Sequence, residues 1–335
     1  MAQWWIVRWL VLALVVVAPL AETACAADAA AGAPVGEVLA EIASTGVFRV
    51  GLRSDVRPFA YVDELGRPAG FCVDMALLLT AKLSEYAGRP VEMVVVSITS
   101  TNRLDKVASG EAMIEMGAST HNAVRDVVVD FSLPYFLSET SFMVRASGGI
   151  ASLADLAGKT VCATSGTSNL PALEAAMADG RVPAAGIEIA DSHEQGVKWL
   201  RDGKVDAYFT DTVLLQSLRT SWPKPADFVV VQDSIHTEPY GWILPENDSD
   251  WRDFVDNFLI WTLEVSCAEQ VFLLDELGIM SACRDGAWSA FDAVYDKWFG
   301  PLSATPVARS AEFDALLAAM QWPDVLEVWP GSAGK

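Results

Sequence analysis

The pattern of hydrophobic and polar residues predicts strands that alternate with helices. Residues 47–53 alternate as a half-buried strand does, and residues 70–88 carry apolar residues at helical spacing. A strand at 91–98, a short helix at 103–110 and a strand at 112–117 follow. Strands that alternate with helices are typical of a parallel, doubly wound sheet.

A second run of the same kind follows along the chain. It starts with a strand-like segment at 153–166, continues through a helical segment at 169–180 and a mixed segment at 194–211, and ends at 227–234. About 300 residues exceed the usual size of one hydrophobic core. We therefore expect two α/β lobes, each built around its own doubly wound sheet.

Two apolar, strand-like segments flank the second run, at residues 141–149 and 237–244. If both cross between the lobes, the first lobe is discontinuous and the two crossings form a hinge. The crevice outside the strand ends is then the expected place for a ligand. The expected division is residues 27–142 and 241–300 for lobe 1, residues 143–240 for lobe 2, and residues 301–335 for a C-terminal tail that packs on lobe 1.

The first 26 residues are typical of a signal peptide. One Arg8 precedes the apolar run from Trp9 to Leu20, and Ala24 to Ala26 form a small-residue cleavage site. A lipid anchor at Cys25 is the alternative, but Glu22 stands where a lipoprotein signal has a bulky aliphatic residue. We therefore expect an exported, periplasmic protein.

The formal net charge is −21. So negative a chain is a poor partner for nucleic acid or an anionic membrane. A small anionic ligand remains compatible with it, because exposed charges are screened beyond about 10 Å and a local arginine cluster can dominate within a cleft.

Cysteine and histidine positions give little sign of redox or metal chemistry. Cys267 and Cys283 close a short loop and could form a disulfide in an oxidising compartment, whereas Cys72 and Cys162 lie in apolar contexts typical of buried thiols. The three histidines do not show the close pairing of a zinc site. We expect no metal and no cofactor.

Several short motifs together resemble a known family. They are GLRSDVRPFAYVDELGRPAGFCVDMA, ITSTNRL, GASTHNAVRDVVVDFSLPYF, SLADLAGKTVCATSGTS, DAYFTDTVLL and EPYGWILP. In order and spacing they resemble the family 3 periplasmic solute-binding proteins of amino-acid ABC transporters, and STNR, THNAVR, DSHEQG and EPYG resemble its glutamate/aspartate-binding branch. The resemblance implies a type II periplasmic-binding-protein fold, an acidic L-amino acid as ligand and a membrane permease as partner. We expect a monomer.

An α-amino acid needs a cation for its carboxylate and an anion for its ammonium. The resemblance makes Arg125 the clamp for the α-carboxylate, and Ser119 and Thr120, between a strand and an expected helix, can add donors. Asp211 ends a strand, and the resemblance assigns it to the ammonium. The alternatives are that Ser119, Thr120 or Asp211 caps a helix and that Arg125 is a solvated helix residue.

The second lobe offers the facing donors at the start of the helix at 169–180. The hydroxyls of Ser165, Thr167 and Ser168 and the backbone N–H groups there are expected to contact the ligand, with Thr167 the first choice. A polar turn of this kind is often only structural.

A second carboxylate on the ligand would demand further cations. Arg53, Arg103 and His193 occupy the positions at which the glutamate/aspartate branch has them, and cations in one cleft would repel each other until an anionic ligand enters. A surface arginine or a satisfied core histidine is the alternative. One departure is Thr212, because the branch has a second acidic residue directly after the aspartate.

Aromatic residues complete the expected site. Phe59 and Tyr61 could form a wall for the methylene groups of the ligand, although Phe59 could equally belong to the core. Tyr240, on the second crossing, could touch the ligand or only support the hinge.

Alternative functions stay open at this point. Some relatives in this family are dehydratases of cyclic carboxylic acids, for which Glu115 or Glu139 could be the acid, but neither has a base partner visible in the sequence. A receptor for another polar amino acid, or one that serves signalling, is also compatible. The expected protein is nevertheless a binding protein and not an enzyme.

Overall fold

The computed structural model describes residues 37–266 and 289–321. The expected signal peptide and the expected Cys267–Cys283 disulfide lie outside the described residues. No helix within the described ranges has the length and apolar composition needed to cross a membrane.

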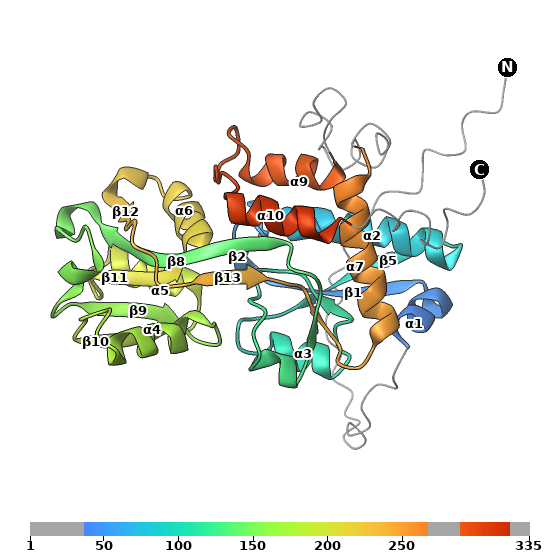
Figure 1. Ribbon diagram of the computed structural model, residues 1–335, viewed down its shortest axis with the longest axis horizontal. Helices are drawn as coiled ribbons and strands as arrows, with labels where there is room; N and C mark the ends of the chain where they lie inside the picture. Colours follow the sequence, from blue (N-terminus) through green and yellow to red (C-terminus); the bar gives the residue numbers. More distant parts are fainter. Residues whose placement is uncertain (1–36, 267–288, 322–335) are drawn as a thin grey trace. The chain divides into compact units, whose positions relative to one another are not determined.

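Helices and strands alternate along the chain, as the hydrophobic pattern predicts (Figure 1). The described α-helices are α1 (Val38–Thr45), α2 (Phe71–Ala87), α3 (Arg103–Ala108), α4 (Asn169–Ala178), α5 (His193–Arg201), α6 (Thr212–Thr220), α7 (Ser249–Glu264), α9 (Ala290–Phe299) and α10 (Ala311–Met320). Short 3₁₀ turns are η1 (Arg125–Val127), η2 (Ala146–Gly148), η3 (Leu153–Leu156) and η4 (Pro225–Asp227).

The first sheet takes strands from both ends of the described chain. Its order is β5 (Glu92–Ser97), β1 (Val47–Leu52), β6 (Ile114–Glu115), β14 (Ile243–Leu244) and β7 (Asp130–Phe131). Strand β1 pairs in parallel with β5 and β6, whereas β14 runs antiparallel to β6 and β7. A small separate sheet contains β2 (Asp55–Val56), β3 (Ala60–Val62) and β4 (Pro68–Ala69).

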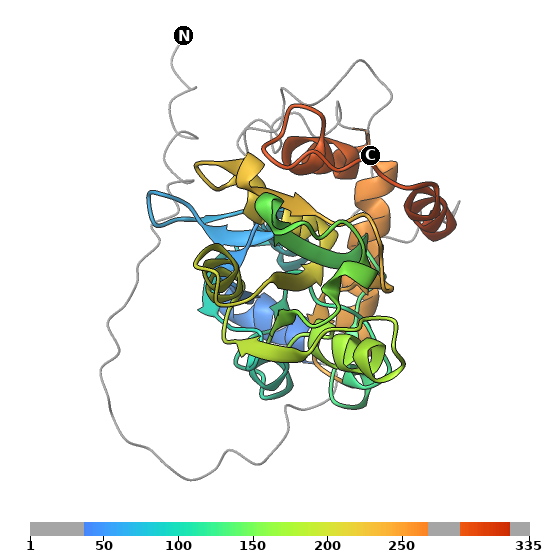
Figure 2. The same ribbon diagram turned by 90° about the vertical axis from the view of Figure 1, so that its left-hand side faces the viewer.

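The second sheet is formed by the middle of the chain. Its order is β10 (Gly186–Ala190), β9 (Thr160–Thr164), β11 (Ala207–Asp211), β8 (Phe136–Arg145) and β12 (Phe228–Val230). Helices cover both faces of this sheet (Figure 2). Phe142 packs in one cluster with Leu173 of α4, and its neighbour Met143 packs in another with Leu200 of α5, because successive side chains of a strand point to opposite faces.

Strands β8 and β13 (Thr237–Tyr240) connect the two sheets. The chain leaves the first sheet through β8 and returns through β13, and these strands pair antiparallel from Thr237 opposite Glu139 to Tyr240 opposite Phe136. Figure 1 shows them side by side. The first crossing starts five residues earlier than the expected segment at 141–149, whose last residues form η2.

The C-terminal helices share the core of the first sheet. Residues of α7, α9 and α10 belong to the same buried cluster as Phe48 of β1 and Leu79 of α2. Within it, the rings of Phe313 in α10 and Phe136 in β8 have centroids 5.4 Å apart. The described part of the tail therefore packs on lobe 1.

The α/β class and the two lobes are confirmed, but two local expectations were wrong. The sheets are mixed rather than purely parallel, because the crossing strand β8 and the returning strand β14 run antiparallel to their neighbours. The helix expected after Thr120 is only the short turn η1, which the Asn122 side chain introduces by accepting hydrogen bonds from the backbone of Val124 and Arg125.

Candidate functional site

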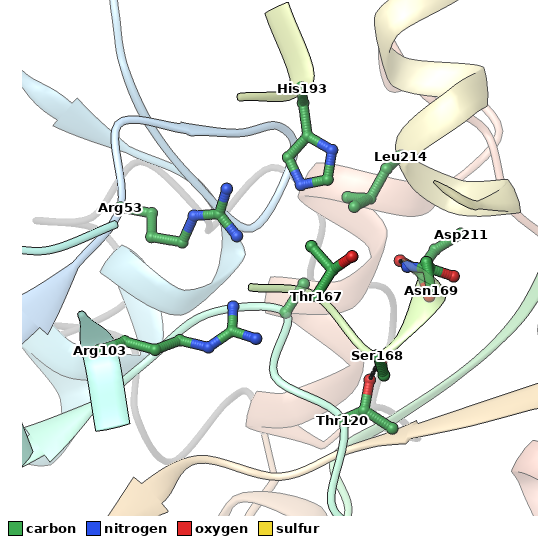
Figure 3. A pocket seen from close by; sticks show the side chains of 10 residues that line it. Arg53, Arg103, Thr120, Thr167, Ser168, Asn169, His193, Asp211 and Leu214 are labelled. Atoms are coloured by element: carbon green, nitrogen blue, oxygen red, sulfur yellow. Dashed lines mark hydrogen bonds between the residues drawn. The ribbon is translucent and has the colours of Figure 1, made fainter. Parts of the chain in front are cut away.

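A small polar cavity lies where the first sheet's loops meet helices of the second sheet (Figure 3). Its lining residues are Arg53, Arg103, Ala118, Thr120, Thr167, Ser168, Asn169, His193, Asp211 and Leu214. The cavity holds about 10 Å³, which is room for about one water molecule. A larger and more open cavity of about 490 Å³ lies beside Asp55 and Arg57, against α5 and the end of α6.

Two guanidinium groups form one end of the cavity. Arg53 directly follows β1, and its guanidinium forms two hydrogen bonds of 2.9 Å with the Asp55 carboxylate. Arg103 begins α3 and donates from a terminal nitrogen to the carbonyl of Gly166 at 3.3 Å, whereas its Nε has no hydrogen-bond partner among the described residues. Burial, with a smaller effect of Arg125, lowers the pKa of Arg103 to about 9, so Arg103 stays cationic at neutral pH.

A buried carboxyl group lies close to this end but does not line the cavity. Glu115 in β6 is fully buried, and neither of its carboxylate oxygens has a hydrogen-bond partner in the described part of the chain. Burial raises the pKa of Glu115, and Arg103 opposes this rise. Glu139, the other acid considered for a dehydratase, is exposed and also lies outside the cavity lining.

His193 lines the cavity as a neutral side chain. It begins α5, is buried, and its Nδ1 lies 2.6 Å from the Tyr208 hydroxyl. Burial and the neighbouring Arg53 lower the pKa of His193 to about 3. In the tautomer in which Nδ1 accepts from Tyr208, Nε2 carries the proton and His193 offers a neutral donor. The expected repulsion among three cations is therefore reduced, since Asp55 also pairs with Arg53.

Asp211 and Asn169 form the opposite end of the cavity (Figure 3). Asp211 precedes α6 but makes no capping hydrogen bond; its Oδ2 instead accepts from Asn169 at 3.0 Å. Its Oδ1 has no partner among the described residues, and the same holds for Oδ1 of Asn169. Burial and the nearby Glu238 raise the pKa of Asp211 to about 6. The side chain of Asp211 therefore does not cap α6.

Hydroxyl groups line the space between the two ends. Thr167 donates to the carbonyl of Thr164 at 2.7 Å, and the hydroxyl oxygens of Thr120 and Ser168 lie 2.9 Å apart. Ser165 is close in sequence, but it does not line the cavity.

The cavity lining also leaves out Phe59, Tyr240 and Ser119. Phe59 is fully buried among aromatic rings that include Phe136 and Tyr240, which agrees with the core alternative, and its role as a ligand wall stays a prediction. Tyr240 is buried in the same cluster. Ser119 is buried, and its hydroxyl has no partner among the described residues.

Arg125 is buried beside Thr120, a residue of the cavity lining, rather than exposed on a helix. Its guanidinium donates to the carbonyl of Thr120 at 2.7 Å. Burial lowers its pKa, while Glu238, Glu115 and Asp211 oppose the change. Its role toward an α-carboxylate, like that of Ser119, Ser165 and Tyr240, stays a prediction.

Two residues, Asn169 and Glu238, were not among the site residues expected from the sequence. Asn169 follows directly after the turn singled out for its hydroxyls, and its position at the start of a helix that faces the site was the available signal. Glu238 lies in the EPYG motif on a crossing strand, where an acidic residue in an otherwise apolar segment was the signal.

The arrangement is complementary to a small molecule with an anionic and a cationic group. Guanidinium groups lie at one end and a carboxyl group at the other. Within the part of the chain that the structure describes, one buried polar atom each of Arg103, Asn169 and Asp211 has no hydrogen-bond partner. Buried polar atoms are rarely left unpaired in native proteins, so such atoms around a cavity point to a ligand. No cluster of metal-binding side chains occurs in the part of the chain described.

Comparisons with known proteins agree with this arrangement. Residues 48–264 match the bacterial extracellular solute-binding proteins, family 3. The glutamate/aspartate import solute-binding protein of Salmonella typhimurium is 29% identical over 79% of this chain and 87% of its own length. The glutamate/glutamine/aspartate/asparagine-binding protein BztA of Rhodobacter capsulatus is 30% identical over 67% of this chain and 66% of its own length.

A solved structure shows the same fold. The ancestral amino acid-binding protein AncCDT-1, a precursor of cyclohexadienyl dehydratase, superposes with a TM-score of 0.60 at 25% identity, over 78% of this chain and 100% of that structure. The sequence match over residues 48–264 and this shared fold together identify the family. The protein is a member of family 3 of the bacterial extracellular solute-binding proteins.

Proposed function

We propose that this protein captures an acidic L-amino acid, glutamate or aspartate, between its two lobes and delivers it to the permease of an ABC transporter. The observation that carries the proposal is the separation of charge across the cavity, with Arg53 and Arg103 at one end and Asp211 at the other. A ligand with one ammonium and two carboxylates would pair with all three groups.

The ammonium is assigned to the end formed by Asp211. Its buried Oδ1 has no hydrogen-bond partner in the described ranges, and a ligand ammonium placed there would supply both a hydrogen bond and a compensating charge. Asn169 would assist, because its free Oδ1 can accept while its amide nitrogen holds the aspartate in place.

The preference for an acidic side chain rests on Arg103. Its buried Nε has no hydrogen-bond partner among the described residues, and Asp55 forms its direct ion pair with Arg53. A ligand carboxylate would pair directly with this desolvated cation, whereas an amide or an alkyl group could not form that ion pair. The names of the two relatives support the same class of ligand, although one of them names amides as well.

Ligand entry requires the cavity to widen. A volume of about 10 Å³ does not hold an amino acid, so entry would involve bending of the crossing strands β8 and β13, as in the hinge closure of two-lobed receptors. The family membership and the expected signal peptide support a periplasmic location for this capture step.

Binding is favoured over catalysis. AncCDT-1 links the fold to an enzyme lineage by its name, but neither acid considered for dehydration, Glu115 or Glu139, lines the cavity. A dehydratase would need an acid that reaches the leaving group.

Isothermal titration calorimetry on protein that has been unfolded, freed of ligand and refolded tests the proposal. We expect heat with L-glutamate or L-aspartate, weaker binding of L-glutamine, and no conversion of prephenate. If neither acidic amino acid gives heat or a thermal shift, the proposed ligand is wrong.

A matched pair of arginine variants tests the basis of acidic selectivity. Arg103→Met should weaken glutamate binding by roughly 2–5 kcal/mol, because it removes a buried partner of the ligand carboxylate. Arg89→Met, which removes an exposed arginine whose guanidinium donates hydrogen bonds to the backbone of residues 44 and 45, should change little. Equal affinities of the two variants would remove Arg103 from the binding site.

A further inference from the structure

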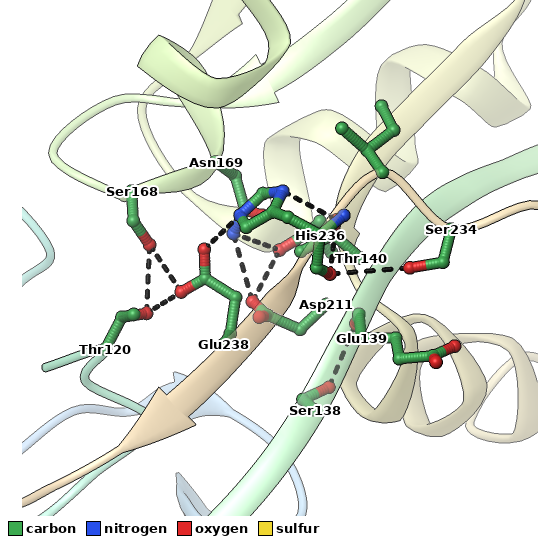
Figure 4. Close-up of polar contacts among 12 residues, drawn as sticks. Thr120, Ser138, Glu139, Thr140, Ser168, Asn169, Asp211, Ser234, His236 and Glu238 are labelled. Carbon is green, nitrogen blue, oxygen red and sulfur yellow. Dashed lines mark hydrogen bonds and ion pairs between the residues drawn. The ribbon is translucent and has the colours of Figure 1, made fainter. Parts of the chain in front are cut away.

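Glu238 forms a buried polar centre next to the cavity (Figure 4). It lies on β13, its side chain is 1% exposed, and its Oε2 accepts hydrogen bonds from Thr120 and, at 2.8 Å, from Ser168. Its Oε1 lies 2.5 Å from Nε2 of His236. Glu238 does not line the cavity, although both hydroxyls that it binds do.

These contacts join four separate parts of the molecule. Thr120 belongs to the loop after β6 of the first sheet, and Ser168 precedes α4 of the second. Glu238 and its partner His236 belong to the second crossing, while Nδ1 of His236 lies 3.1 Å from the hydroxyl of Thr140 on the first crossing. One carboxylate thus connects both lobes and both crossings.

Ser168 makes this contact instead of a local one. It occupies the N-cap position of α4, but its side chain makes no capping hydrogen bond. Ser192, Ser289 and Ser310 hold the same position in other helices and do cap them. The hydroxyl of Ser168 is therefore directed across the cleft, where it serves the contact between lobes rather than the helix.

We propose that Glu238 is a positioning residue that holds the cleft closed by binding Thr120 and Ser168 from opposite lobes at the same time. The two hydroxyl oxygens lie 2.9 Å apart, so both contacts exist only when the lobes are together. A carboxylate suits this task because its hydrogen bonds to hydroxyl groups are charge-assisted, whereas the uncharged amide oxygen of a glutamine would hold the same two hydroxyls more weakly.

This inference rests on closure of the proposed binding protein but not on the identity of its ligand. It gives a role to Glu238, which is not among the expected ligand contacts. It also gives Thr120 and Ser168 a role before any ligand arrives, since their hydroxyl hydrogens are directed to Glu238.

Small-angle X-ray scattering of the ligand-free protein tests the proposal without reference to any solute. Glu238→Gln should give a larger radius of gyration than the wild type, because the open form becomes more populated. Ser168→Ala should act in the same direction, and the double variant should expand no further than Glu238→Gln alone, since both changes break one connection. For any ligand established by calorimetry, Glu238→Gln should lower the association constant roughly ten- to hundredfold.

Glu139→Gln is the matched control. It removes an exposed carboxylate from the strand that pairs with β13, outside the contacts of Glu238, and should scatter as the wild type does. A folded Glu238→Gln protein with wild-type scattering would overturn the proposal, as would equal expansion of Glu139→Gln. If Glu238→Gln does not fold, Ser168→Ala decides alone: expansion supports the proposal and wild-type scattering overturns it.

Discussion

Burial favours the neutral forms of two titratable residues, Asp211 and His193, that line the same cavity. It raises the pKa of Asp211 to about 6 and lowers the pKa of His193 to about 3. For Asp211 the folded pKa lies above the ordinary value of 3.8, so protonation stabilises the fold. This contribution of Asp211 to the free energy of unfolding is fully present below pH 3.8 and is lost as the pH rises through about 6.

Ligand affinity should therefore depend on pH through Asp211. A ligand ammonium favours the ionised carboxylate, so affinity for glutamate should fall by up to about tenfold for each pH unit below about 6. His193 should not contribute, because it stays neutral over this range. Calorimetry at pH 6 in two buffers of different ionisation enthalpy should show that protons are released on binding.

Asp211→Asn provides the control for this titration. The variant should bind weakly, and its residual affinity should not change between pH 5 and 7, because the titrating carboxyl group is gone. A wild-type affinity that is constant over the same interval would contradict the assignment of the ammonium to Asp211.

At this scale, residues at the ends of strands and the starts of helices could be predicted from the sequence. Arg53, Arg103 and Asp211 all lie at such ends, where a polar side chain has to leave the core. The place of Phe59 could not be predicted, because an aromatic residue beside a strand can turn to either side. Glu238 was missed because its partners come from positions 118 and 70 residues away along the chain.

A glycine just before α4 allows the chain there to lie close to the first lobe. Gly166 has φ of +70°, a left-handed conformation, and a Cβ added to it would lie 2.7 Å from the carbonyl oxygen of Ser100. Only glycine fits both conditions without strain. The turn before α4 can therefore lie directly against the loop that precedes Arg103 and α3.

Gly166→Ala should hinder closure. The new methyl group would meet backbone atoms, which cannot move aside as a flexible side chain does, so we expect weaker glutamate binding and a larger radius of gyration. Gly180→Ala is a matched control at the other end of α4, because its φ is +84° but nothing lies within 4 Å of the added carbon. If both variants lose affinity equally, backbone strain rather than the contact between lobes is responsible.

Helix α10 should contribute to the stability of the first lobe. Phe313 is 2% exposed and packs on Phe136 and Tyr295. Phe313→Ala should lower the free energy of unfolding by about 3–5 kcal/mol, measured by urea denaturation. Leu302→Ala, at a side chain that is 94% exposed, should change little, and an equally small effect of Phe313→Ala would show that α10 packs only loosely.

Helices and strands could be predicted wherever the periodic spacing of hydrophobic residues extended over many positions. Helix α2 ends before Gly88 as expected, since that glycine has φ of +62°. The turn η1 could not be predicted, because a single side chain, Asn122, redirects the backbone after Thr120.

Over the whole molecule, the proposed recognition of an acidic ligand has to coexist with a net charge of −21. A large net charge favours solubility, but exposed charges are screened beyond about 8 Å at physiological salt. Within the cavity the local guanidinium groups set the potential instead. The two lobes could be predicted from the repeated pattern, whereas their close contact depends on pairs such as Arg103 with Gly166 that no periodicity reveals.

The pairing of β8 with β13 has a mechanical consequence. Two strands tied at four successive registers behave as one ribbon, which bends readily across its flat face and resists shear along its length. We expect such a ribbon to favour bending over sliding when the lobes move. Because Arg57 lies near β2 and Trp222 follows α6, the outer cavity is lined from both lobes, and we expect closure on a solute to change its width.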